Sequence, residues 1–177
     1  MKGVNKKLLE RFLKLAGEKL KGKWVIIGGC VLPLMGVRYR TTLDIDIVGP
    51  RTSNLSQTLA LMEICESLGM PVEMINQAGA YFLYKIEGWE KNLIPVYQGK
   101  NATIMRPNAT LFILLKLKRF TESDFKDCLK MFKISRQKGE LIDYNKIKRA
   151  IEGEIKKSDS YVRIIRLRKL LKALKSA

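Results

Sequence analysis

Two aspartates, Asp44 and Asp46, lie two positions apart in an otherwise apolar run. On a β-strand, residues i and i+2 point to the same face, about 6.5 Å apart, so both carboxylates can reach one site. An ionised carboxylate among Ile and Val is costly to bury without a partner. A hard divalent cation such as Mg²⁺ or Mn²⁺ relieves this charge and prefers carboxylate oxygens. The pair therefore predicts a metal site that handles phosphate.

A glycine pair, Gly28 and Gly29, ends an earlier apolar run and precedes a short helical segment. Without side chains, the backbone N–H groups and the positive end of a helix can meet a phosphate. Arg40 and Thr42, just before the aspartates, can also point toward bound phosphate. The alternative is an ordinary tight turn beside a solvated pair of carboxylates. The residues by themselves leave both interpretations open.

A second set of charged residues follows in the C-terminal third. Lys116 and Arg119 are three positions apart on one predicted helix, and Asp124 and Asp127 are three apart on the next. Residues three apart share a helix face, so a helix hairpin can present both pairs to one cleft. The alternatives are a salt bridge between the helices and solvated charges.

The two motifs together resemble a known family. An apolar run with Gly28-Gly29, followed by Arg40-x-Thr42-x-Asp44-x-Asp46, resembles the signature of the polymerase-beta-like nucleotidyltransferase superfamily, especially its small abortive-infection (AbiEii), toxin-type branch. The resemblance implies that Asp44 and Asp46 bind Mg²⁺ or Mn²⁺, and that the glycine turn holds the phosphates of a nucleoside triphosphate. It covers roughly residues 20–135.

The segment Lys116-x-x-Arg119 followed by Asp124-x-x-Asp127 is similar to the helical motif of the same branch. The resemblance implies that Lys116 contacts phosphate and that a downstream aspartate assists catalysis. We expect Lys116 and Arg119, with Arg40, to balance the triphosphate charge, and Asp127 or Asp124 to orient or deprotonate the acceptor hydroxyl. The expected activity moves a nucleoside monophosphate onto a hydroxyl of RNA, a protein or a small molecule.

One departure from the superfamily pattern concerns a third carboxylate, which usually lies on a later strand close to the metals. The strand expected to supply it, residues 93–97, has none, and Glu87 on the neighbouring segment is the candidate substitute. Two carboxylates can hold one metal together with water and triphosphate oxygens, whereas a two-metal site benefits from a third ligand. The alternative function is therefore a catalytically weakened protein that binds RNA or a partner.

The net charge of the chain indicates which kinds of partner it could bind. The 177 residues carry a net charge of +17, and residues 111–177 hold 19 Lys and Arg against 8 Asp and Glu. Such an excess attracts polyanions, which favours a tRNA-like acceptor, although a lysine-rich solvated surface is the simpler alternative. A toxin with an acidic antitoxin protein as its partner is a third interpretation. The absence of histidine and of any Cys-x-x-Cys pair argues against a standard zinc site.

No segment predicts a membrane span or a secretory signal. The longest uncharged run, residues 24–37, is shorter than the ~20 residues that a membrane helix needs. Charged residues interrupt the first twenty positions, so a signal peptide is not expected. We expect a cytoplasmic protein without membrane contact.

Apolar periodicity predicts the order of the elements. Helices are expected at residues 4–21, 29–37, 55–68, 107–120, 122–137, 143–156 and about 160–175, and strands at 23–28, 43–48, 72–75, 80–87, 93–98 and 102–105. The expected fold class is α/β: a nucleotidyltransferase-like mixed β-sheet with flanking helices and a helical C-terminal part. We place the α/β core with its N-terminal helix at residues 1–106 and the helical subdomain at 107–177.

The last predicted helix mixes leucines with arginines and lysines. Its basic side chains could bind an RNA backbone, with each neutralised phosphate adding salt-dependent affinity. Equally, its apolar side could close the core while its charges remain solvated. Both interpretations stay open at the level of sequence.

Overall fold

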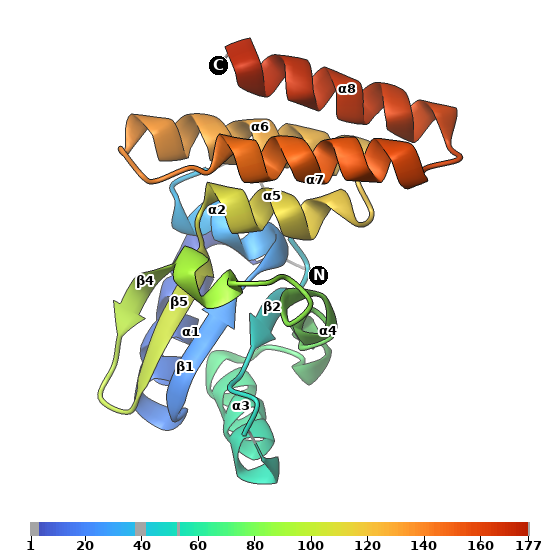
Figure 1. Ribbon diagram of the computed structural model, residues 1–177. Helices are drawn as coiled ribbons and strands as arrows, with labels where there is room; N and C mark the ends of the chain where they lie inside the picture. Colours follow the sequence, from blue (N-terminus) through green and yellow to red (C-terminus); the bar gives the residue numbers. More distant parts are fainter. Residues whose placement is uncertain (1–3, 38–41, 53, 177) are drawn as a thin grey trace. The chain divides into compact units, whose positions relative to one another are not determined.

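The computed structural model of the chain describes residues 4–37, 42–52 and 54–176 (Figure 1). Contacts between Cα atoms divide the chain into two units, Met1–Pro107 and Asn108–Ala177. Among the described residues, all strands belong to the first unit, and the second is helical. The predicted α/β class, with a mixed sheet and a helical C-terminal part, is confirmed.

The described residues of the N-terminal unit form a mixed five-stranded sheet in the order β3-β2-β1-β5-β4. The strands are β1 (Gly22–Ile26), β2 (Ile45–Val48), β3 (Ile75–Asn76), β4 (Leu93–Gln98) and β5 (Ala102–Pro107). β1 is antiparallel to β2 and parallel to β5, β2 is parallel to β3, and β4 is antiparallel to β5. The strands that carry the glycine turn and the aspartates are therefore direct neighbours.

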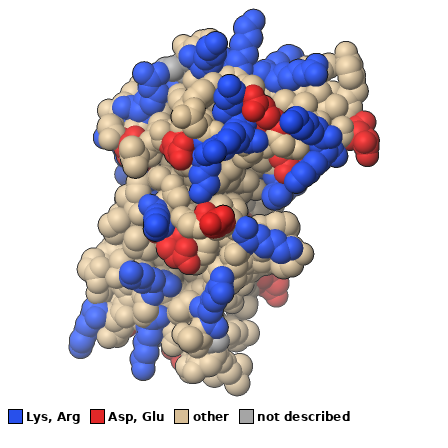
Figure 2. All heavy atoms as spheres, in the orientation of Figure 1, with Lys and Arg blue, Asp and Glu red and all other residues tan. Residues whose placement is uncertain are grey.

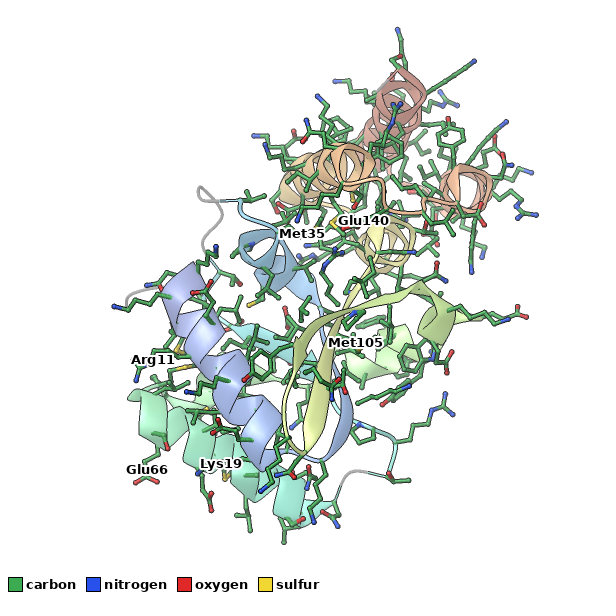
Figure 3. All side chains as sticks on the ribbon, turned by 90° about the vertical axis from the view of Figure 1, so that its left-hand side faces the viewer. Arg11, Lys19, Met35, Glu66, Met105 and Glu140 are labelled. Atoms are coloured by element: carbon green, nitrogen blue, oxygen red, sulfur yellow. The ribbon has the colours of Figure 1, made fainter. Side chains whose placement is uncertain are left out.

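Helices α1 and α3 pack against each other beside the sheet, and α1 also contacts β5 and β4 (Figure 1). The helical elements of this unit are α1 (Lys6–Lys19), η1 (Gly28–Cys30), α2 (Val31–Leu34), α3 (Leu55–Leu68), η2 (Val72–Met74), α4 (Ala80–Leu83) and η3 (Trp89–Asn92). The Asn5 side chain caps α1 by accepting the Leu8 N–H at 2.9 Å. Phe12 of α1 is buried, whereas Arg11 of α1 and Glu66 of α3 point outward (Figure 3). The amphipathic pattern of α1 thus produces the predicted helix.

Two predicted strands differ from the structure. The strand predicted at residues 80–87 is wrong, because its first half is α4. A strand would bury every second residue, but Leu83 is fully buried while Tyr81 and Phe82 are exposed. The strand expected at 72–75 begins as η2, and pairing starts only at β3. The consequence is that Asn76, which lies just outside the predicted strand, belongs to the strand beside β2.

The described residues of the C-terminal unit fold into four helices around one apolar core. They are α5 (Ala109–Leu117), α6 (Glu122–Gln137), α7 (Tyr144–Lys157) and α8 (Tyr161–Ser176). Phe120, Cys128, Ile147 and Leu170 are among the fully buried side chains of this core. The four predicted helices are confirmed, with bounds shifted by one or a few residues.

Charge is distributed over both units. On the face drawn in Figure 2, Lys and Arg gather more densely over the C-terminal helices than over the sheet unit, with acidic side chains between them. No helix among the described residues has the length and apolarity needed to cross a membrane.

Candidate functional site

The glycine turn lies directly against Asp46. The Ile27 N–H donates to the Asp46 carbonyl at 2.9 Å, which continues the pairing of β1 with β2. Gly28 follows with φ of +66°, in the left-handed region that favours glycine. A Cβ placed on Gly28 would overlap Asp46 Oδ2 and lie 2.8 Å from its Cγ. Only glycine permits both this backbone turn and the position of the Asp46 carboxylate.

Asn76 of β3 holds the other oxygen of the same carboxylate. Its Nδ2 donates to Asp46 Oδ1 at 2.7 Å. The Ala78 N–H donates to Asn76 Oδ1 at 3.0 Å, which assigns the amide oxygen to Ala78 and the amide nitrogen to Asp46. Asn76 is therefore a neutral donor that orients the Asp46 carboxylate. It occupies a position on the strand next to β2 at which an acidic residue would have supplied a further carboxylate.

The strand predicted to supply the third carboxylate lies elsewhere in the sheet. Residues 93–97 belong to β4, at the opposite edge from β3, with β1 and β5 between β2 and β4. Glu87 is exposed in the turn that follows α4 and is not on a strand. The expectation that strand 93–97 lies close to the aspartates is wrong, because the order of strands depends on long-range pairing that the sequence pattern does not encode.

Asp44 lies in the bend immediately before β2, with an exposed side chain. Its backbone carbonyl accepts the Cys30 thiol at 3.1 Å and the Thr42 hydroxyl at 3.3 Å. The Thr42 carbonyl in turn accepts the Val4 N–H at 2.7 Å. These bonds fix the backbone of Asp44 next to the segment that follows Gly28, and leave its carboxylate facing solvent. Arg40 lies outside the described residues.

The donor chemistry of this site suits a hard divalent cation. Asp44 and Asp46 supply carboxylate oxygens, and β2 alternates buried Ile45 and Ile47 with the half-buried Asp46. Among the described residues, no group of three or more His, Cys, Asp or Glu side chains could hold a metal together. A cation here would thus take the rest of its oxygen ligands from water and from phosphate.

The second predicted set of residues forms an ion-pair cluster within the C-terminal unit. Lys116 Nζ lies 2.8 Å from Asp124 Oδ1 and 3.4 Å from Asp127 Oδ2. Arg119 Nε lies 3.4 Å from Asp124 Oδ2. The structure thus brings together all four predicted residues, as the salt bridge between helices that their spacing also allowed.

Asp124 is fully buried and accepts several hydrogen bonds. Its Oδ2 accepts the Thr121 N–H at 2.9 Å and the Thr121 hydroxyl at 2.8 Å, and these residues form the capping box of α6. Burial raises the pKa of Asp124, but hydrogen bonds from Lys116 and the Thr121 backbone, with the Lys116 charge, outweigh it and hold the pKa well below its usual range. Asp124 is therefore ionised and tied to the start of α6.

Two arginines of the C-terminal helix α8 form hydrogen bonds within their own unit. Arg163 donates to the Leu117 carbonyl at 2.8 Å, and Arg166 donates to the Phe120 carbonyl at 3.0 Å. These carbonyls lie at and just beyond the end of α5, where backbone carbonyls have no N–H partner within the helix. The buried leucines of α8 close the core. The exposed basic side chains of α8 are Arg168, Lys169, Lys172 and Lys175.

An α/β sheet whose central strands bring a glycine turn against a carboxylate matches the predicted nucleotidyltransferase-like fold. Residues 6–168 match the model of a family described as nucleotidyltransferase of unknown function (DUF6036). This match spans most of the chain, and the protein belongs to that family. No curated protein and no solved structure matches the chain.

Proposed function

We propose that the protein is a nucleotidyltransferase that uses Mg²⁺ or Mn²⁺ to move a nucleoside monophosphate from a triphosphate to a hydroxyl acceptor. The approach of Gly28 to the Asp46 carboxylate supports this proposal, because a side-chain-free turn lies directly beside the carboxylate that we propose as a metal ligand. The family match supports the reaction class.

Asp44 and Asp46 would hold the cation, which when bound neutralises charge on the phosphoryl group being transferred. Asn76 orients the carboxylate of the half-buried Asp46. The side chain of Asp44 is exposed, so it can change rotamer when a metal–nucleotide complex binds. The backbone at Gly28 and Gly29 would hold the phosphates, and Thr42 keeps the chain before Asp44 in place. Arg40 is proposed as a phosphate contact on sequence grounds.

In the C-terminal unit, we assign Lys116 and Arg119 to the charge of the triphosphate. Asp127 or Asp124 is proposed to orient or deprotonate the acceptor hydroxyl, and both carboxylates accept Lys116. These two bonds also keep the Lys116 ammonium group in place.

The proposed acceptor is inferred from the net charge of the chain. A net charge of +17 favours RNA, with tRNA as the proposed acceptor. The finer placement in the abortive-infection, toxin-type branch rests on the two motifs, and it would make an acidic antitoxin protein a partner. Co-purification from the native host tests this point: recovery of an acidic protein supports it, and recovery of the chain alone contradicts it.

The transfer experiment uses each of the four labelled nucleoside triphosphates with Mg²⁺ and total RNA. We expect the wild type to incorporate label from at least one nucleotide and Asp44→Ala to lose incorporation. Asp159→Ala, which removes an exposed carboxylate from the other unit, is the matched control and should behave as wild type. Undiminished incorporation by Asp44→Ala would contradict the proposal.

A second candidate function is a binding protein with weakened transfer. It is favoured by Asn76, a neutral residue on the strand that lies beside Asp46. Measurable binding of nucleotide or RNA by the wild type, without incorporation from any of the four nucleotides, would select this second function.

A further inference from the structure

Helix α4 exposes two aromatic rings beside the candidate site. Tyr81 is 63% exposed and Phe82 is 46% exposed, whereas the next residue, Leu83, is fully buried. The two rings meet edge to face, with centroids 5.3 Å apart and planes at 85°. Two neighbouring aromatic rings exposed to water form a candidate ligand-binding surface, because burying them against a ligand is favourable.

Cations accompany the aromatic rings of this segment. Lys85 Nζ lies 3.6 Å from the centroid of the Tyr81 ring, and the Arg51 guanidinium lies 4.6 Å from that of Tyr84. Tyr84 is fixed from the other end, because its hydroxyl donates to the Gly49 carbonyl at 2.7 Å. A nucleotide has a flat base and a charged phosphate. An aromatic ring can stack on the base, and a nearby cation can bind the phosphate.

The chain that leads into α4 begins at the candidate site itself. Asn76 donates to Asp46, and its own side-chain oxygen accepts the Ala78 N–H. At Gly79, a Cβ would overlap the end of the Ile27 side chain, so this segment lies directly against the residue before Gly28. Tyr81 follows two residues later, and Figure 1 shows α4 beside β2. The exposed rings are therefore tethered to the carboxylate and the glycine turn by a short, hydrogen-bonded segment.

We propose that Tyr81 and Phe82 form a platform for a nucleobase, which stacks on one ring and lies against the other, whose plane is turned by 85°, with Lys85 facing the attached phosphate. This inference rests on the proposed function, since it assigns the platform to a nucleotide at the Asp44–Asp46 site. The base belongs either to the nucleoside triphosphate or to the end of the RNA acceptor. Both share the same chemistry, and the experiment distinguishes them.

The test measures equilibrium binding of three probes in the presence of Mg²⁺: the four nucleoside triphosphates, inorganic tripolyphosphate and a short single-stranded RNA. The variants are Tyr81→Ala and Phe82→Ala, with Tyr81→Trp as the variant that keeps an aromatic face. Tyr161→Ala is the matched control, because Tyr161 is 75% exposed and belongs to the other unit. All three positions are exposed, so the four variants should fold.

We expect the variant that removes the stacked ring, Tyr81→Ala or Phe82→Ala, to weaken binding of base-containing probes roughly 5- to 150-fold, the range for losing one base–aromatic stack. Binding of tripolyphosphate should be unchanged, and Tyr81→Trp and Tyr161→Ala should match the wild type. A loss for the triphosphates assigns the platform to the donor base, and a loss confined to the RNA assigns it to the acceptor.

Equal weakening of tripolyphosphate binding, or no change with any probe, would overturn the platform. The same outcome follows if the wild type binds none of the base-containing probes. A platform failure leaves the proposed function intact if Asp44→Ala still abolishes transfer. Conversely, ring-dependent binding without any transfer supports the platform and rejects the proposed activity.

Discussion

Asp46 in the sheet unit and Asp124 in the helical unit are both held by neighbouring donors, but their surroundings differ. The half-buried Asp46 accepts a neutral amide from Asn76 and lies against Gly28. The fully buried Asp124 accepts Lys116, Arg119 and the Thr121 cap. A carboxylate compensated by internal cations maintains the structure, whereas one beside a side-chain-free turn and solvent suits an external cation.

The sharpest way to break this comparison is to remove the charge of Asp46 alone. We expect Asp46→Asn to lower nucleotide transfer by about 1,000-fold, a size typical of losing electrostatic stabilisation at a reacting group. The free energy of unfolding should change by about 1 kcal/mol or less, because Asn still fills the space beside Gly28. Parallel transfer assays and urea unfolding curves check both results. A large loss of stability would show that Asp46 is structural.

Asp124→Asn should give the opposite result. We expect the free energy of unfolding to fall by about 3 kcal/mol, because the variant leaves the largely buried Lys116 with a weaker partner and disturbs the cap of α6. Urea unfolding checks this, with Asp159→Asn as the exposed control, which should stay within about 0.5 kcal/mol of wild type.

Acid titration gives a second reading of the Asp124 cluster. The folded pKa of Asp124 lies below its unfolded value, so the unfolded state binds more protons as the pH falls. Stability from this group is complete above the unfolded pKa and is lost as pH falls through about 4 and below. Asp124→Asn should flatten this part of the stability–pH curve. An unchanged slope would contradict the assigned ion pairs.

Gly28→Ala sharpens the comparison at the glycine turn. An added Cβ meets both the positive φ and the Asp46 carboxylate, so we expect a loss of about 2 kcal/mol in stability. Because Asp46 must move, Mg²⁺-dependent nucleotide binding should weaken at least tenfold. Gly36→Ala is the control, since Gly36 also has positive φ but nothing lies within 4 Å of an added Cβ. Equal losses of nucleotide binding in both variants would mean that backbone strain alone matters.

The smallest expected effect concerns Asn76. We expect Asn76→Asp to destabilise the protein by about 1 kcal/mol without metal, because two carboxylates then face each other, and to recover stability when Mg²⁺ is added. Thermal unfolding with and without Mg²⁺ measures the difference. Asn76→Ala, which removes the donor without adding charge, should show no gain in Mg²⁺ response over wild type. If Asn76→Asp responds to Mg²⁺ no more than wild type, β3 does not face the metal.

The sequence predicted the parts of the site that depend on local spacing. The neighbourhood of Gly28 and Asp46 follows from two strands joined by a short connection, and the pairing of Lys116 with Asp124 follows from two consecutive helices. Asn76 was missed because β3 is short and pairs with β2 across about 30 residues. The aromatic stretch of α4 was mistaken for a strand, because Tyr and Phe are common in strands and only burial reveals the helical turn.

The most direct measurement of the central claim is a crystal structure with Mn²⁺ and a non-hydrolysable nucleoside triphosphate. We predict an anomalous signal for Mn²⁺ bound by carboxylate oxygens of both Asp44 and Asp46 at about 2.1 Å, with triphosphate oxygens on the same ion and the phosphates against Gly28 and Gly29. Manganese bound elsewhere, or carboxylates of Asp44 and Asp46 turned away from the nucleotide, would contradict the account.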